Sequence, residues 1–394
     1  MTGREARTGG LPAAAGVPRV VISTDDTSTF TNTGAAGINN LVALGDLLLI
    51  DNVGRNFEIR RLTTHANEPV FAQICRYDVT IFPGEDVPST LDLDVHGAAL
   101  SGDGSWLLVE NHYGHVRCFE WPSPRMQPGF RPAPAFELQF LGDTERVLLY
   151  DDCLIVSSPR GAYVADPPRP GIFVSEQVAP PRASAPDMAR RRLGYVHALE
   201  DWGTVIRLAI DPHLQLLAVA SCDRVGVFAL ERTTEGPRVG RCLWKTAIAQ
   251  SMQWLAIDPV RDQVLSAGYD GGDSDPDGEN WNACRGGVLN AWSLRGELLS
   301  AMALPDTTAW GYGSDALTLS REGTVVYLVD RTAGLHAIDL TTGHIEERCA
   351  GLRMPDSQPV PSLGIGHCAL VESRLYAGFS RGGYRLFQYD ISRG

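Results

Sequence analysis

Short apolar runs recur along this chain at a regular spacing. Seven runs of about five residues each end in a turn, and two more strand-like segments follow each of them. Their starts lie roughly 45 to 60 residues apart, which is the length of one propeller repeat with loop insertions. The pattern therefore predicts an all-β, seven-bladed β-propeller whose innermost strands are residues 40–44, 96–100, 145–149, 206–210, 253–257, 315–319 and 367–371.

The third segment of each unit alternates large and polar side chains. Val116 to Trp121 and Tyr384 to Tyr389 show this alternation clearly, and it is typical of half-buried strands, not of helices. A glycine marks the turn before each third segment: Gly54, Gly114, Gly161, Gly226, Gly287, Gly334 and Gly383. We expect these glycines to supply the positive φ that a tight reversal needs.

The last unit stops after its third strand, whereas one unassigned strand-like segment, Arg19 to Thr24, precedes the first unit. We expect this N-terminal segment to form the outer strand of the last blade and so to close the ring. Closure removes the two exposed sheet edges of an open array. The sequence thus predicts one propeller domain over residues 19–394, preceded by a disordered tail over residues 1–18.

Several turns have the form found in known propellers. Ser101-Gly102-Asp103-Gly104, within the unit from His96 to Trp121, gives that unit the form of a degenerate WD repeat. Ile210-Asp211-Pro212, Ile257-Asp258-Pro259 and the turn from Ala337 to Gly343 are similar to turns of bacterial WD-like and quinoprotein-like propellers. From about Pro18 onward the chain therefore resembles the WD-repeat-like and quinoprotein-like seven-bladed propeller superfamily, and the resemblance implies the fold.

Composition and charge limit the classes of partner and the compartment that we expect. The net charge of −13 argues against nucleic acid as a partner, and no apolar stretch has the length of a membrane span. Residues 1–16 lack a secretory apolar core, so we expect a cytoplasmic protein. Lysine occurs once, at Lys245, among abundant arginines, which suggests a high-GC bacterial genome. The eight cysteines are scattered singly, which favours buried free thiols over a zinc or redox site.

The long connections fall on one predicted face. Loops 77–95, 179–204, 269–286, 305–314 and 353–366 all open there, while the turns on the other face are short. Long loops in a compact fold tend to carry function, so this face is the expected binding surface. Within one of these loops, residues 187–199 have the form of a short helix that Asp187 caps, with Arg190, Arg191 and Arg192 on its outer side. The other interpretation is a solvated cover over the apolar residues Met188, Leu193 and Val196.

Another of these loops is acidic. Asp273, Asp275 and Asp277 alternate ahead of Gly278, as at the start of a calcium loop in which side chains converge on one hard cation. The later acidic ligand is missing, because Cys284 stands where a bidentate glutamate is expected. Calcium and a merely solvated acidic loop both remain open, and no other cofactor is expected.

The opening position of each inner strand, expected near the channel mouth, carries a polar residue in most blades. These residues are Asn40, His96, Glu145, Arg207 beside Ile206, Gln253, Asp315 and His367. One interpretation is an ordinary wet channel lined by polar side chains. The other is a polar cup that either performs acid/base chemistry, with His96 or His367 as the base and Glu145 or Asp315 orienting it, or holds a metal.

Arginines and aromatic residues add to the same face. The turns between second and third strands hold Arg160, Arg224, Arg331 and Arg381, and guanidinium groups pair well with planar anions. The alternative is that these arginines only reflect the arginine richness of a high-GC genome. Trp310 and Tyr312 could wall a pocket, or could pack the loops against the blades.

Two classes of function fit these features. One is a binding module whose loop-bearing face recognises a protein segment or a small acidic ligand. The other is an enzyme, such as a lyase, isomerase, cyclase or calcium-assisted lactonase, acting at the channel mouth. The chain lacks the local motifs of common hydrolases and dehydrogenases, but propeller enzymes that carry one residue per blade leave no such motif.

Overall fold

A computed structural model gives the fold of the chain. The structure describes residues 18–22, 37–52, 56–65, 68–78, 95–100, 106–111, 115–121, 136–139, 146–150, 153–158, 161–165, 171–173, 189–191, 194–195, 202, 205–221, 223–233, 236–270, 286–310, 315–353, 362–380 and 385–391. Across these residues the regular elements are β-strands. No helix among them has the length and apolar character needed to cross a membrane.

The strands of the first half of the chain pair in four-stranded sheets, each numbered outward from its innermost strand. The β2 sheet holds β2 (Ile38–Leu44), β3 (Leu47–Asn52), β4 (Asn56–His65) and β5 (Glu68–Asp78); the β6 sheet holds β6 (Val95–Leu100), β7 (Trp106–Asn111), β8 (His115–Glu120) and β9 (Phe136–Gln139); the β10 sheet holds β10 (Arg146–Tyr150), β11 (Cys153–Ser158), β12 (Gly161–Ala165) and β15 (Gly194–Tyr195). Between β12 and β15, β13 (Gly171–Phe173) and β14 (Ala189–Arg191) form a separate parallel pair.

The second half of the chain repeats this arrangement. The β16 sheet holds β16 (Val205–Asp211), β17 (Leu216–Ser221), β18 (Arg224–Thr233) and β19 (Gly236–Ala247); the β20 sheet holds β20 (Gln250–Asp258), β21 (Gln263–Asp270), β22 (Val288–Ser293) and β23 (Leu298–Ala303); the β24 sheet holds β24 (Leu317–Leu319), β25 (Val325–Val329), β26 (Leu335–Asp339) and β27 (Ile345–Cys349); the β28 sheet holds β28 (Gly366–Val371), β29 (Arg374–Phe379), β30 (Leu386–Asp390) and, outermost, β1 (Arg19–Ile22).

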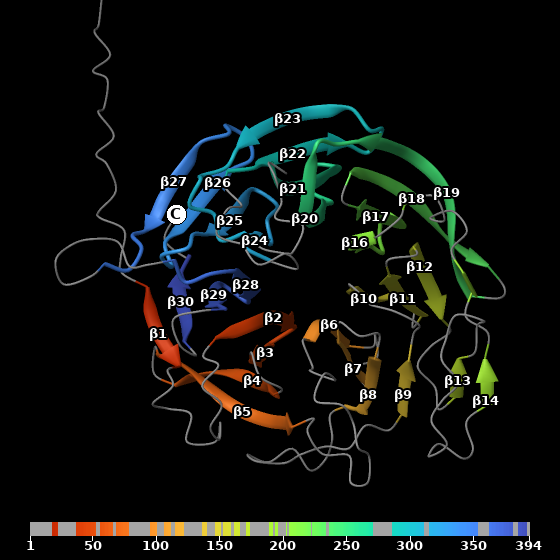
Figure 1. Ribbon diagram of the computed structural model, residues 1–394, viewed down its shortest axis with the longest axis horizontal. Helices are drawn as coiled ribbons and strands as arrows, with labels where there is room; N and C mark the ends of the chain where they lie inside the picture. Colours follow the sequence, from red (N-terminus) through yellow and green to blue (C-terminus); the bar gives the residue numbers. More distant parts are fainter. Residues whose placement is uncertain are drawn as a thin grey trace, which may run out of the picture.

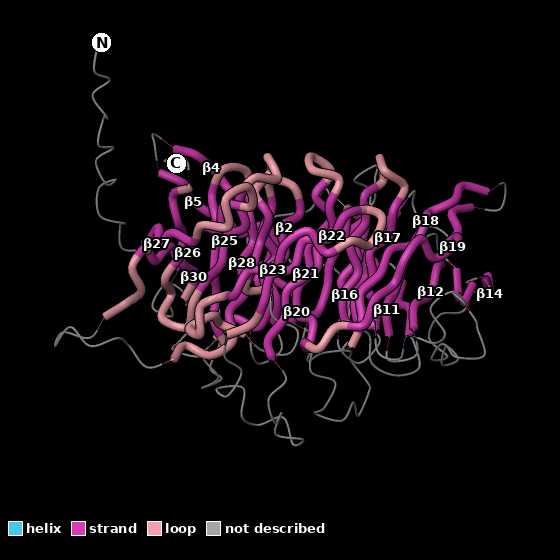
Figure 2. Tube along the Cα trace, turned by 90° about the horizontal axis from the view of Figure 1, so that it is seen from above, coloured by secondary structure: helices cyan, strands magenta, loops and turns pink. Residues whose placement is uncertain are grey.

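The sheets stand side by side around a common centre, as Figure 1 shows. Innermost strands of neighbouring sheets contact one another: β2 with β6, β6 with β10, β10 with β16, β16 with β20, β20 with β24, β24 with β28, and β28 with β2. Seen from the side, the strands lie between two rims of turns (Figure 2). The molecule is an all-β propeller, and the apolar runs read from the sequence form its innermost strands.

The N-terminal strand lies far in sequence from its partner. β1 pairs antiparallel with β30, with Arg19 opposite Gln388 and Val20 opposite Phe387. Of the expected tail, residues 1–17 lie outside the described residues, and Pro18 is buried.

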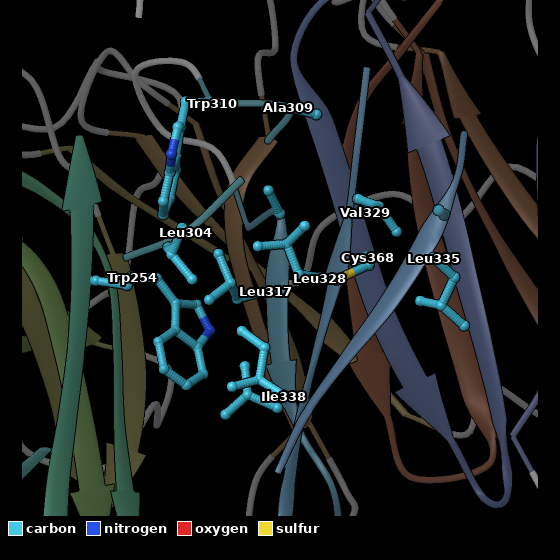
Figure 3. Packing of buried hydrophobic residues seen from close by; sticks show 14 of the residues in the cluster. Trp254, Leu304, Ala309, Trp310, Leu317, Leu328, Val329, Leu335, Ile338 and Cys368 are labelled. Carbon is cyan, nitrogen blue, oxygen red and sulfur yellow. The ribbon is translucent and has the colours of Figure 1, made fainter. Parts of the chain in front are cut away.

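Apolar side chains fill the space between sheets. One cluster joins Trp254 of β20, Leu317 and Leu328 of the β24 sheet, and Cys368 of β28, and Figure 3 shows these side chains packed between their strands. β17, with the sequence LLAVAS, is buried along its whole length because both faces of its sheet are covered by neighbouring sheets. The alternation of large side chains thus serves contact between blades.

Two expectations from the sequence are wrong in detail. Gly287 does have a positive φ of 120°, but Gly226 and Gly334 are not among the residues with positive φ, and Ala333 adopts φ 63° instead. Glycine is needed at Gly226 for close approach, because a Cβ there would lie 2.6 Å from the carbonyl oxygen of Trp244.

The helix expected within residues 187–199 is also wrong. β14 and β15 occupy this segment, and β15 pairs with β12 as the outer strand of the β10 sheet. Sheet pairing therefore overrides the local capping signal of Asp187, which itself lies outside the described residues.

Candidate functional site at the channel mouth

Several inner strands are irregular at the end where they begin. The register with the second strand shifts between Ile38 and Asn40 in β2, between Val95 and Gly97 in β6, between Val205 and Arg207 in β16, and between Met252 and Trp254 in β20. Each shift leaves one extra residue, which is Asn39, His96, Ile206 or Gln253. Such β-bulges redirect side chains locally and are common beside functional sites. A bulge near the start of the inner strand is therefore a structural feature that these four sheets share.

The bulges also explain why the sequence alignment of the openings is uneven. His96 and Gln253 are the extra residues of their strands, whereas Asn40 and Arg207 follow the extra residue and pair with the second strand. Asn39, not Asn40, thus corresponds to His96. A bulge adds one residue while the buried strand remains apolar, so the apolar pattern does not reveal it.

Arg207 is the best-defined polar group of this mouth. Its side chain is buried, its Nε donates a hydrogen bond of 2.6 Å to the carbonyl oxygen of Gln253, and the same Nε lies 3.9 Å from Oδ1 of Asp315. The contacts reach from the β16 sheet across the β20 sheet to Asp315, two residues before β24. The structure therefore brings together three of the predicted site residues, which come from three neighbouring sheets.

Gln253 is positioned from both sides. Its backbone carbonyl accepts the hydrogen bond from Arg207 Nε, while its buried amide Nε2 donates to Oγ of Ser251 at 3.1 Å. The bulge at Gln253 turns this carbonyl toward Arg207 in place of the regular sheet partner. Asp315 is less buried, with 23% of its side chain exposed, so the carboxylate faces solvent on one side.

His367 lies beside Asp315 in space. The N–H of Cys368 donates to the carbonyl oxygen of Asp315 at 2.8 Å, so the openings of β24 and β28 are adjacent. The side chain of His367 is 3% exposed. Burial and the nearby Asp315 raise the pKa of the Cys368 thiol well above its ordinary value, which keeps that thiol protonated and a poor nucleophile.

Asn40 is buried in the β2 sheet. Its Oδ1 accepts a hydrogen bond from the N–H of Leu41 at 2.8 Å, and it stands opposite Asp51 of β3, which is fully buried. Asn40 thus stabilises the start of its own strand through its side chain.

Two of the four arginines predicted in the turns between second and third strands are described, and their contacts differ. Arg224 forms a paired contact with its neighbour Asp223, with Nε–Oδ1 at 2.9 Å and Nη2–Oδ2 at 3.0 Å. Arg331 is fixed through its backbone, because its N–H donates to Thr307 and its carbonyl accepts from Leu363. Arg160 and Arg381 lie outside the described residues.

Trp310 packs its loop against the blades. Its side chain is 1% exposed, its Nε1 donates to the carbonyl oxygen of Gly286 at 2.6 Å, and its ring lies 6.4 Å from that of Tyr269. Figure 3 shows the ring pointing toward Leu304. Of the two interpretations of the aromatic residues, packing is the one that these contacts support for Trp310. Tyr312 lies outside the described residues.

Other predicted site residues also lie outside the part of the chain that the structure describes. They are Glu145 and the acidic residues Asp273, Asp275 and Asp277, while His96 is described only as backbone in β6. Among the described residues, no group of three or more His, Cys, Asp or Glu side chains is placed to hold a metal ion. The calcium loop stays a prediction.

Comparison with known proteins supports the fold. No family model matches the chain, and no curated protein matches it in sequence. Among solved structures, the WD40 β-propeller domain of Doa1 is similar, with a TM-score of 0.55 over 92% of this chain and 96% of that chain, at 11% sequence identity. The resemblance read from the turns is thereby confirmed at the level of the fold: the chain is similar to WD40 β-propellers.

Proposed function

We propose that this chain is a binding module in which the mouth of a WD40-like propeller recognises a protein segment or a small acidic ligand. The observation that carries the proposal is Arg207, a buried cation that the Gln253 carbonyl fixes at the mouth. Guanidinium groups bind carboxylates and phosphates through paired hydrogen bonds, and a buried cation acts more strongly than one in water. Similarity to WD40 propellers agrees with such a role by analogy of fold.

The neighbouring Asp315 gives the proposal a test with two opposite outcomes. Fluorescein-labelled acidic, neutral and basic peptides of equal length would be titrated against the wild type, Arg207→Met and Asp315→Asn. Arg207→Met should weaken binding of the acidic peptides by at least about tenfold. Asp315→Asn should tighten it by about tenfold, because it removes a like charge close to the bound anion.

Two checks make the result interpretable. Arg241→Gln, which changes an exposed arginine of the outer strand β19, should leave peptide affinity unchanged. Circular dichroism and thermal unfolding of each variant would verify that it is folded. Acidic-peptide affinity that responds to neither Arg207 nor Asp315 would overturn the proposal.

The enzyme alternative rests on a different contact. The bond from Cys368 N–H to the Asp315 carbonyl brings Asp315 and His367 to adjacent strand openings, as an acid/base pair requires. If the mouth catalyses a reaction, Asp315→Asn should abolish turnover while retaining the fold. The same variant thus separates the two functions, since the binding module predicts tighter anion binding.

We further propose that the ring has seven blades, that β1 closes it, and that residues 19–394 form one domain that resides in the cytoplasm. The pairing of β1 with β30 and the contacts between β28 and β2 support closure. Removing residues up to Thr24 should then cause aggregation or loss of cooperative unfolding, because β30 would be left as an exposed edge. Unchanged thermal stability would refute closure.

A further inference from the structure

The contact between Arg207 and Asp315 at the channel mouth places two opposite charges side by side. Arg207 Nε carries a single hydrogen, which it donates to the carbonyl oxygen of Gln253 at 2.6 Å. Oδ1 of Asp315 lies 3.9 Å from the same Nε, beyond hydrogen-bond distance. The attraction between this nitrogen and the carboxylate is therefore one of charge alone, and it does not saturate either group.

A second arginine–aspartate contact in the chain has a different geometry. Arg224 and Asp223 form two direct hydrogen bonds, Nε–Oδ1 at 2.9 Å and Nη2–Oδ2 at 3.0 Å, and 63% of the Asp223 side chain is exposed. These two charges satisfy one another in a paired contact. At the mouth, 4% of the Arg207 side chain and 23% of the Asp315 side chain are exposed. A ligand of the mouth would therefore approach from the side of Asp315.

Neighbouring sheets hold both charges of the mouth in place. The carbonyl of Gln253 in β20 fixes Arg207 of β16. The N–H and Sγ of Cys368 in β28 donate to the backbone carbonyl of Asp315 at 2.8 and 3.2 Å, so neither of these bonds uses the carboxylate. The four sheets follow one another around the common centre (Figure 1). The mouth thus presents a cation and an anion that are positioned before any ligand binds, which lowers the cost of binding.

We propose that the mouth binds a free α-amino acid, whose carboxylate pairs with Arg207 and whose ammonium group pairs with Asp315. This inference rests on the proposed function, because it keeps Arg207 as the group that binds the ligand carboxylate, and it names the class of ligand. Asp315 repels a ligand that carries only negative charge. A ligand with both charges meets an opposite charge at each of them.

The separation of the two protein charges selects the ligand class. Standard bond lengths and angles place the ammonium nitrogen of an α-amino acid about 3 Å from its carboxylate oxygens, which is close to the 3.9 Å between Arg207 Nε and Asp315 Oδ1. A peptide carries its terminal ammonium and carboxylate groups at opposite ends, and a simple carboxylate has no ammonium group. The free α-amino acid therefore fits this arrangement best.

Derivatives of the ligand test the proposal on the wild-type protein. The protein amino acids would be screened at about 10 mM by the rise in unfolding temperature that each causes, because a ligand that binds the folded state stabilises it. Isothermal titration calorimetry would then give the Kd of the amino acid with the largest effect. N-acetylation of that amino acid removes its positive charge and should raise Kd at least about tenfold, and conversion of its carboxylate to an amide should do the same.

Two variants assign each ligand group to its partner. In Asp315→Asn, N-acetylation should change Kd by less than about twofold, and in Arg207→Met the amide should do so, because the partner of the altered group is already gone. Asp315→Asn should thus weaken binding of the amino acid although it tightens binding of acidic peptides. The matched control is Asp223→Asn in the exposed pair, which should leave amino-acid affinity unchanged.

Three results would overturn this inference. They are the absence of any amino acid with a Kd below about 1 mM, an N-acetylated form that binds as tightly as the free one, and a folded Asp315→Asn variant with unchanged amino-acid affinity. The first two need only the wild-type protein, so they decide the matter even where a variant fails to fold. If acidic peptides still lose affinity in Arg207→Met, the proposed function stands and only the amino acid is removed as its ligand.

Discussion

Two turns of the propeller share an aspartate followed by an arginine, yet they use the aspartate in opposite ways. In the β16 sheet, the side chain of Asp223 is 63% exposed and pairs with Arg224 in solvent. In the β24 sheet, Asp330 is buried, and its Oδ1 accepts hydrogen bonds from the N–H and Oγ1 of Thr332 and from the N–H of Gly334. The Asp-Arg dipeptide thus forms a surface ion pair in the β16 sheet. In the β24 sheet its aspartate is instead a buried acceptor that holds its own turn together by hydrogen bonds.

The difference follows from what surrounds each turn. Asp330 Oδ2 lies 3.1 Å from Nε2 of His336, and the hydroxyl of Tyr389, from the neighbouring β28 sheet, donates to Ala333 of the same turn. The Asp223 turn instead has Ser221 Oγ as its nearby side-chain donor. A buried carboxylate with several donors holds a turn rigidly, whereas an exposed pair contributes little because water competes for both charges.

The largest effect is expected from removing the buried carboxylate. Asp330→Ala removes the acceptor of the buried N–H of Gly334 and of the half-buried donors of Thr332, so the free energy of unfolding should fall by about 3 kcal/mol. Urea unfolding followed by tryptophan fluorescence would measure the change. A loss below about 1 kcal/mol would mean that the hydrogen bonds to Asp330 do not stabilise the folded protein as proposed.

A smaller loss is expected at the glycine of the same turn. A Cβ at Gly334 would overlap the Asp330 carboxylate, so Gly334→Ala should destabilise the protein by about 2 kcal/mol through overpacking. The matched control is Gly343→Ala in the next turn, where the atom nearest to a new Cβ is Sδ of Met302 at 3.5 Å and only the positive φ of 71° opposes the change. Because its cost comes from the backbone, about 1 kcal/mol is expected there.

Acidification should weaken the hydrogen bonds that the Asp330 carboxylate accepts, without any mutation. Burial alone would raise the pKa of Asp330, but hydrogen bonds from His336, Thr332 and Gly334 outweigh it and hold this pKa below the ordinary value of 3.8. The folded-state pKa is therefore depressed, so the stabilisation is present above about pH 4 and is lost as pH falls through the folded-state pKa. The stability difference between wild type and Asp330→Asn should shrink below pH 4. A difference that stays constant to pH 2 would contradict this assignment.

The two turns also show what the sequence could and could not predict. The apolar periodicity identified the innermost strands of the sheets that the structure describes, because burial between sheets depends on side-chain type. Arg224 and Arg331 looked equivalent in sequence, but the exposure of the preceding aspartate depends on packing from a neighbouring sheet. The bulges at Ile206 and Gln253 were missed for a related reason: an added residue changes hydrogen-bond register while the apolar pattern continues.

The smallest effect is expected at the exposed turn. Asp223→Ala removes the carboxylate that pairs with Arg224, but both groups are solvated, so the free energy of unfolding should change by less than about 0.5 kcal/mol. Arg224, released from its neighbour, should then bind anions more readily, and acidic peptides at the mouth should gain affinity by about twofold at low salt if this arginine belongs to the binding surface. The gain should vanish in 0.5 M NaCl, because exposed charges are screened. Urea unfolding and peptide titration on the same preparation would measure the two effects separately. A stability loss like that of Asp330→Ala would show that both aspartates stabilise their turns in the same way. Unchanged peptide affinity would show that Arg224 does not belong to the binding surface.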